Sequence, residues 1–172
     1  MHQILLRAVE PVDLELLYVW ENSPEVWAHS DTPAPLSRHV LQQYIEEAQR
    51  DVYAAQQLRL MVDLVSADGS RITIGTVDLY DFNPQHSRAG VGVLIFEAAL
   101  RRQGYATQAL QQLMEYAFGT LHLHQLYCTV AESNAASIAL FTKLGFEVTG
   151  VRREWRWQQQ AFESEVFMQR MA

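Results

Sequence analysis

The 172-residue sequence predicts a single mixed α/β domain with strands and helices interspersed along the chain. Two observations carry this prediction. Short runs rich in Leu, Val, Ile and Thr, which are typical of strands, occur in both halves of the chain. In other segments apolar residues recur at steps of three and four, which is typical of amphipathic helices. The expected order is β-α-α-β-β-β-α-β-α-β-β, with no repeat, low-complexity segment or linker.

The first part of the chain is expected to form a strand over 3–8 and then two helices. Pro11 marks the start of the first helix, because its missing N–H costs nothing in a first turn. Pro24 ends that helix, because the residue before a proline is driven away from helical angles. After a proline-containing loop at 31–35, Ser37 is the expected N-cap of the second helix. The apolar stripe of this second helix comprises Val40, Leu41, Tyr44, Ile45 and Ala48.

A hairpin is expected next, with strands over 58–65 and 71–80. Asp68 and Gly69 lie between them and tolerate the positive φ of a tight hairpin turn. Pro84 interrupts the stretch that follows the second strand.

The second half is expected to alternate strands and helices. The predicted elements are a strand at 90–96, a helix at 106–118, a strand at 126–130, a helix at 135–144 and strands at 147–157 and 162–171. Gly145 closes the second of these helices, because glycine takes the left-handed C-terminal position most easily.

Composition excludes several classes of protein. A net charge of −7 argues against nucleic-acid binding, which usually needs a basic surplus, and it is compatible with a cationic substrate such as a polyamine. The same charge also simply favours solubility. No apolar stretch is long enough to span a membrane, and the N-terminus lacks the features of a secretory signal. A single cysteine, Cys128, cannot form an internal disulfide, so we expect a reducing, cytoplasmic environment.

The most informative segment is the basic, glycine-containing turn between the 90–96 strand and the helix after it. The first turn of a helix leaves backbone N–H groups without partners at the positive end of the dipole. Gly104 and Ala106 carry little or no side chain, so a pyrophosphate could approach those N–H groups closely. Arg101 and Arg102 add positive charge where cations disfavour the helix itself, and a bound anion would explain them. A loop that only needs a glycine and carries solvated arginines is the alternative.

Two segments resemble signatures of the GNAT superfamily of acetyltransferases. Residues 101–106, Arg-Arg-Gln-Gly-Tyr-Ala, are similar to the (Gln/Arg)-x-x-Gly-x-(Gly/Ala) motif that binds the pyrophosphate of acetyl-CoA. Residues 134–137, Asn-Ala-Ala-Ser, and 140–146, Leu-Phe-Thr-Lys-Leu-Gly-Phe, resemble the family's Asn-x-x-(Ser/Ala) and (Leu-Tyr)-x-x-(Leu/Cys)-Gly-Phe segment. Positions 6–8, 13–14, 20 and 162–166 are similar to the subgroup of ribosomal-protein (RimJ/RimL type) and spermidine (SpeG type) N-acetyltransferases.

The resemblance covers nearly the whole chain and implies a GNAT fold, a mostly antiparallel sheet splayed at a bulge and flanked by about four helices. The pantetheine arm of acetyl-CoA would lie between the strands at 91–96 and 125–130 and pair with backbone groups there. The implied cofactor-binding residues are Leu94, Ile95, Phe96, Arg101, Arg102, Gln103, Gly104, Tyr105, Ala106, Thr107, Asn134, Ser137, Phe141 and Lys143. An ordinary helix N-cap at Asn134 is the alternative to direct contact.

The implied reaction is direct attack of a primary amine on the thioester, without a metal. A backbone N–H, at Ile95 or a neighbour, could polarise the thioester carbonyl. Many relatives protonate the leaving thiolate with a tyrosine where this chain has Phe141, and Gly90 stands where a glutamate base often lies. Ser137 lies one turn before Phe141 on the same face, so we predict it as the acid or hydrogen-bond donor. A hydroxyl bonded back to its own helix is the alternative.

The general base stays open at this point. The available carboxylates are Glu97, Asp78, Asp81 and Glu132, acting directly or through water. Tyr105 and Tyr127 could reach the site, although aromatic residues of strands and helices usually belong to the core. His122 and His124 have no third ligand at metal-site spacing, and Cys128 is expected to be a small buried apolar residue. Trp27 lies in the region that lines the acceptor pocket in relatives.

The resemblance leaves the acceptor open between a polyamine such as spermidine and a protein N-terminal amine. An aminoglycoside-type antibiotic is a further alternative. A non-catalytic acyl-CoA-binding regulatory module is the alternative from another functional class, because Phe141 and Gly90 lack the expected acid and base. Most relatives pair, so the resemblance implies a homodimer or higher homo-oligomer.

Overall fold

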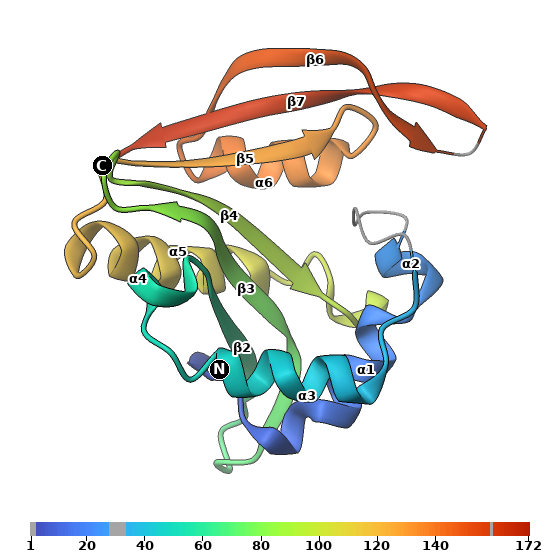
Figure 1. Ribbon diagram of the computed structural model, residues 1–172, viewed down its shortest axis with the longest axis vertical. Helices are drawn as coiled ribbons and strands as arrows, with labels where there is room; N and C mark the ends of the chain where they lie inside the picture. Colours follow the sequence, from blue (N-terminus) through green and yellow to red (C-terminus); the bar gives the residue numbers. More distant parts are fainter. Residues whose placement is uncertain (1–2, 28–33, 159) are drawn as a thin grey trace.

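The computed structural model describes residues 3–27, 34–158 and 160–172, which form the predicted mixed α/β architecture (Figure 1). The strands are β1 (Gln3–Ala8), β2 (Leu58–Val65), β3 (Arg71–Asn83), β4 (Arg88–Ile95), β5 (Gln125–Ala131), β6 (Glu147–Gln158) and β7 (Ala161–Met171). The helices are α1 (Leu14–Glu21), α2 (Pro24–Trp27), α3 (Arg38–Glu47), α4 (Val52–Ala55), α5 (Tyr105–Gly119) and α6 (Ala135–Lys143), with 3-10 turns η1 (Pro11–Asp13) and η2 (Ala98–Leu100). None of the described helices is long and apolar enough to cross a membrane.

The strands form one seven-stranded sheet in the order β1-β2-β3-β4-β5-β7-β6. Among the described strands β4 and β5 make the one parallel pair, and they are paired only where 88–90 meet 125–127, at the start of both strands. Beyond these residues the two strands diverge, so the predicted splay is confirmed (Figure 1). The pairing of β4 with β3 is regular from Gly90 to Ile95, so the splayed part of β4 carries no register shift. Register shifts occur instead between Tyr80 and Asn83, where Asp81 has a φ of 47°, and between Val62 and Asp63 in the β2–β3 pairing.

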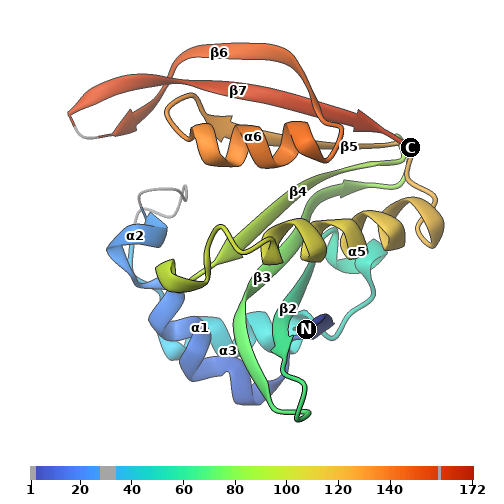
Figure 2. The ribbon, with the colours of Figure 1, turned by 180° about the vertical axis from the view of Figure 1, so that it is seen from behind.

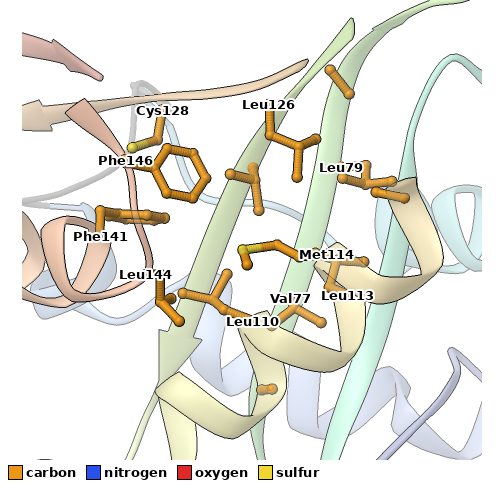
Figure 3. Packing of buried hydrophobic residues seen from close by; sticks show 14 of the residues in the cluster. Val77, Leu79, Leu110, Leu113, Met114, Leu126, Cys128, Phe141, Leu144 and Phe146 are labelled. Carbon is orange, nitrogen blue, oxygen red and sulfur yellow. The ribbon is translucent and has the colours of Figure 1, made fainter. Parts of the chain in front are cut away.

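Helices cover both faces of the sheet. Helix α5 lies across one face of β2, β3 and β4, and α1 and α3 lie on the other (Figures 1 and 2). The three-and-four spacing predicted for α5 buries Leu110 and Leu113 in the core, beside Val77, as Figure 3 shows. Because β4 and β5 are parallel, the helices that follow them, α5 and α6, begin at the same open end of the splay.

The predicted second helix is confirmed, but its apolar stripe is narrower than expected. Ser37 accepts a hydrogen bond from the Val40 amide as the N-cap, and Leu41 and Ile45 are buried. Val40, by contrast, is 46% exposed, because adjacent helical positions are about 100° apart and it falls on the outer face. Helix α4 was not predicted; Asp51 caps it by accepting from two backbone amides.

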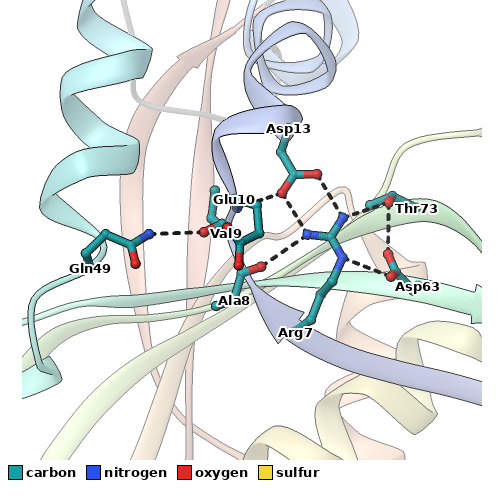
Figure 4. Close-up of polar contacts among 8 residues, drawn as sticks. All are labelled: Arg7, Ala8, Val9, Glu10, Asp13, Gln49, Asp63 and Thr73. Carbon is teal, nitrogen blue, oxygen red and sulfur yellow. Dashed lines mark hydrogen bonds and ion pairs between the residues drawn. The ribbon is translucent and has the colours of Figure 1, made fainter.

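Arg7 fastens the N-terminal helices to the sheet, as Figure 4 shows. Its guanidinium donates to both carboxylate oxygens of Asp13, at 2.7 and 2.8 Å, to Asp63 at 2.9 Å and to Thr73 at 3.0 Å. The Asp13 carboxylate also accepts from the Glu10 amide at 2.8 Å. Arg7 therefore joins η1 to β2 and β3, and so positions α1 over the sheet.

Candidate active site

The divergence of β4 and β5 opens a cleft of about 510 Å³. The cleft is lined by residues of β2, β3, β4, β5, β6, α3 and α6, and of the loop that leads to α6. Asn134, Ser137 and Phe141 stand on one side of it, and Asp78 belongs to the β3 side. The splay therefore brings the predicted acid and one predicted base into one hollow.

The predicted phosphate turn has the backbone geometry of an anion site. Gly104 is the N-cap of α5 with a φ of +85°, and Arg102, two residues earlier, has a φ of 62°. Within the described part of the chain no side chain caps the first turn of α5, so the amides of Tyr105, Ala106 and Thr107 are available. A Cβ built at Gly104 would meet nothing within 4 Å. This open backbone cradle fits a diphosphate.

Arg101 is placed differently from the prediction. Its Nε donates to the carbonyl of Ile95 at 2.8 Å, and its terminal nitrogens bond the carbonyl of Phe96 and the carboxylate of Glu25. The guanidinium therefore fastens the end of β4 instead of standing as a free counter-ion for phosphate. Arg102 is the exposed arginine of the turn.

Gln103 also makes hydrogen bonds within the turn. Its side-chain amide donates to the carbonyl of Ala99 at 2.7 Å, and its oxygen accepts from the Tyr105 hydroxyl at 3.1 Å. Tyr105 is buried in the core, so it does not reach the cleft.

The backbone at the end of β4 presents one N–H of residues 94–96 to the gap. The Phe96 amide donates to the Ile74 carbonyl on β3 at 3.0 Å, and the Leu94 carbonyl projects toward β3, 1.8 Å from where a Cβ of Gly75 would stand. In an extended strand successive amides face opposite edges, so the Ile95 N–H faces away from β3 and toward the splay. This is the orientation that an oxyanion donor requires. Leu94 and Phe96 instead direct their backbone groups to β3 or Arg101.

Asn134 acts as the N-cap of α6, as one of the two alternatives proposed. Its Oδ1 accepts from the Ser137 amide at 3.1 Å. The Ser137 hydroxyl is half-buried and makes no hydrogen bond within the described part of the chain, so the alternative of a bond back to its helix is not observed. Phe141 is buried edge-on against Phe146, with ring centroids 5.1 Å apart.

Of the four predicted carboxylate bases, the structure brings only Asp78 into the cleft. Its carboxylate accepts from Arg59, which also bonds Glu21. Asp78 is therefore held in an ion pair with Arg59. Asp81 is exposed on the bulge, where it accepts from the Tyr127 hydroxyl at 3.2 Å.

Glu97 and Glu132 are both exposed outside the cleft lining, Glu97 before η2 and Glu132 just after β5. Asp78 is therefore the one predicted carboxylate that lines the cleft.

Comparison with known proteins shows the family. The sequence model of the family described as acetyltransferase (GNAT) domain matches residues 3–147 of this chain. The chain belongs to the GNAT acetyltransferase family. It is accordingly an acyltransferase, and its acyl donor is acetyl-CoA, the donor that GNAT enzymes use.

Curated relatives of this GNAT enzyme include proteins with different acceptors. The spermidine N(1)-acetyltransferase of Escherichia coli (strain K12) is 28% identical over 150 residues, which cover 87% of this chain and 75% of that protein. The L-amino acid N-acetyltransferase AaaT of Escherichia coli (strain K12) is 23% identical over 172 residues, or 99% of each chain. A crystal structure of spermidine N-acetyltransferase from Vibrio cholerae in complex with CoA and spermine has the same fold, with a TM-score of 0.84, 23% identity and 98% and 95% coverage of the two chains.

The GNAT cleft contains residues that sequence analysis missed. Tyr80, Arg59, Tyr44 and Arg156 all line it. The signal for Tyr80 was the alternation along β3, where Thr76, Asp78 and Tyr80 share one face and Val77 and Leu79 the other. Burial raises the pKa of Tyr44 to about 12, while the nearby Arg59 lowers it.

The remaining predicted residues of the enzyme lie elsewhere. Tyr127 stacks on Phe167 at 5.4 Å and bonds Asp81. Lys143, in the last turn of α6, lines a second hollow of about 950 Å³ between α5 and the ends of β6 and β7, rather than the cleft.

Cys128 is buried, and burial raises the pKa of its thiol to about 12, so it is unsuited to act as a nucleophile. Among the described residues no three His, Cys, Asp or Glu side chains gather into a set that could hold a metal ion.

Proposed function

We propose that this GNAT enzyme acetylates a primary amine of a small molecule by direct attack in a ternary complex. The observation that carries the proposal is the splay between β4 and β5, at whose open end the uncapped first turn of α5 also lies. When bound, acetyl-CoA supplies an activated thioester. The cradle at 102–107 would hold its diphosphate. A backbone N–H on the splay side of β4, that of Ile95 or of its neighbour Val93 in the cleft lining, would donate to the carbonyl oxygen of the thioester.

The rest of the cleft would orient the reactants and exclude water from them. Ser137 lies beside Asn134 and Phe141 on the α6 side, and it offers a hydroxyl with no partner within the described residues. Strands β4 and β5 would hold the acetyl donor and the acceptor amine together, and much of the rate enhancement would come from this positioning. The amine would enter from the β3 side, where Asp78 lies.

For the acceptor, the names of the relatives and the charge of the cleft support different candidates. Relatives that act on spermidine support a polyamine. Arg59 in the described lining is neutralised by Asp78 and Glu21, but the lining also contains Arg156. Arg156 makes no ion pair within the described part of the chain. A second candidate is therefore an amine that also carries a carboxylate, such as an amino acid, which the AaaT relative also supports.

A panel of amines tests these proposals. Thiol release from acetyl-CoA is measured with spermidine, free amino acids, a peptide with a free N-terminus and an aminoglycoside. Turnover with any primary amine supports the acetyltransferase, while tight binding of acetyl-CoA without turnover would support the non-catalytic module. The variant Arg156→Gln separates the acceptors: it should raise KM for amino acids at least tenfold and leave KM for spermidine unchanged or lower.

We also propose that the enzyme self-associates. Edge strand β6 pairs with β7 alone among the described strands and exposes Val148, Val151, Trp155 and Trp157. An exposed apolar edge strand favours pairing with another chain. Sedimentation velocity of the wild-type enzyme and of Trp155→Glu tests this proposal. We expect an oligomeric wild type and a dissociated variant, and a monomeric wild-type enzyme would contradict the proposal.

A further inference from the structure

Tyr80 occupies the space that the family's expected glutamate would need. It lies directly opposite Gly90 in the β3–β4 register. A Cβ built at Gly90 would stand 2.2 Å from Cε2 of Tyr80, and one at Gly92 would stand 3.9 Å from its Cε1. The ring therefore lies across two glycines of β4 that share one face, and any side chain at position 90 would displace it.

The surroundings place the Tyr80 ring where the gap begins. Gly90 and Tyr127 form the last pair between β4 and β5, so the strands separate just beyond them. Tyr80 packs edge-on against the Tyr127 ring, with ring centroids 5.9 Å apart. Tyr80 lines the same cleft as Ser137.

The phenol is held in its protonated form. Burial raises the pKa of Tyr80 above its ordinary range, the neighbouring Tyr127, Cys128 and Asp81 raise it further, and a hydrogen bond with Thr129 opposes them. A hydroxyl with a raised pKa can donate a hydrogen bond at neutral pH but cannot act as a base. Phe141, at the position of the family's usual phenol, has no proton to donate.

We propose that the Tyr80 hydroxyl donates a hydrogen bond to the thioester sulfur as acetyl transfer proceeds, an inference that rests on the proposed function. The amine nitrogen forms a bond to the carbonyl carbon, and the C–S bond breaks with its electron pair going to sulfur. The nitrogen loses a proton to water, and the departing thiolate takes one from water, so Tyr80 ends the step protonated. Its contribution is to stabilise the negative charge that develops on sulfur.

The variant Tyr80→Phe tests this proposal, because it keeps the ring over Gly90 and Gly92 and removes only the hydroxyl. We expect the single-turnover rate of acetyl transfer to fall about tenfold to a hundredfold, with the dissociation constant of coenzyme A within twofold of wild type. Tyr127→Phe is the matched control, since it removes a neighbouring hydroxyl that bonds Asp81, and its rate should stay within twofold. Gly90→Ala, which forces the ring aside, should also slow transfer and leave coenzyme A binding intact.

An unchanged rate in Tyr80→Phe, or an equal fall in Tyr127→Phe, would overturn the assignment while the acetyltransferase activity stands. If the wild-type enzyme binds acetyl-CoA and releases no thiol with any amine, the proposed function and the role of Tyr80 both fail. A loss of coenzyme A binding in Tyr80→Phe would assign the residue to ligand binding and would also overturn the proposal.

Discussion

Replacing Gly104 with alanine tests the phosphate cradle, and the structure sets the size of both expected effects. Gly104 has a φ of +85°, a conformation that costs an L-residue about 1–2 kcal/mol. For a domain of this size each kcal/mol lowers Tm by about 2–4 °C, so we expect Gly104→Ala to lower Tm by roughly 2–8 °C. The new Cβ would meet nothing within 4 Å, so no steric clash within the protein adds to this cost.

The effect on ligand binding should be separate and larger. The Cβ of Gly104→Ala would project beside the first-turn amides of α5, where the diphosphate is expected to lie. A hydrogen bond to a charged group contributes about 1.5–3 kcal/mol, and losing one weakens binding by roughly tenfold to a hundredfold. Gly104→Val should weaken binding further and also destabilise the turn more, because β-branched residues tolerate positive φ poorly.

Gly69→Ala provides a matched control. Gly69 has a φ of +83° and also has nothing within 4 Å of a built Cβ, but it lies in the β2–β3 hairpin turn. Titration calorimetry with coenzyme A and thermal unfolding of both variants separate strain from ligand contact. We expect the two variants to lose similar amounts of Tm, and only Gly104→Ala to lose affinity for coenzyme A. Equal affinity for coenzyme A in the two variants would refute the cradle at 102–107.

Four further predictions follow from the contacts described above. Arg7→Ala leaves two carboxylates, on Asp13 and Asp63, buried without their cation and should lower the free energy of unfolding in urea by about 3 kcal/mol. Burial alone would raise the pKa of Asp13, but the hydrogen bonds from Arg7 and the Glu10 amide outweigh it and hold the pKa below 3.8. This stabilisation is present above pH 3.8 and is lost as the pH falls through the lowered pKa, so a wild-type enzyme that keeps its full stability at pH 2 would contradict the assignment. Cys128 should react with iodoacetamide at pH 8 only after unfolding, and rapid labelling of the native enzyme, followed by mass spectrometry, would disprove its burial. Ser137→Ala should slow turnover about tenfold with little change in coenzyme A affinity, and a wild-type rate would remove Ser137 from the mechanism.

The order and type of the main elements, and the position of the phosphate turn, were predictable because they depend on residues close in sequence. The spacing of Leu110 and Leu113 buries one face of α5 whatever it packs against, and Ser37 caps the amides three residues ahead of it. The positive φ of Gly104 follows from a property of glycine itself. Outlying elements such as α4 were missed because four residues are too short to show a period.

Only the tertiary structure decided which groups face the cleft. Tyr80 covers Gly90 because the β3–β4 register places the two residues opposite each other. A one-residue slip of this register would have placed Tyr80 on the opposite face of the sheet. Arg101 bonds the carbonyls at the end of β4 because the chain turns back there through η2. No local sequence pattern predicts this turn. The pairing of β4 with β3 turns the Ile95 N–H toward β5, and because β5 pairs with β4 only at 88–90, this N–H has no partner strand among the described residues.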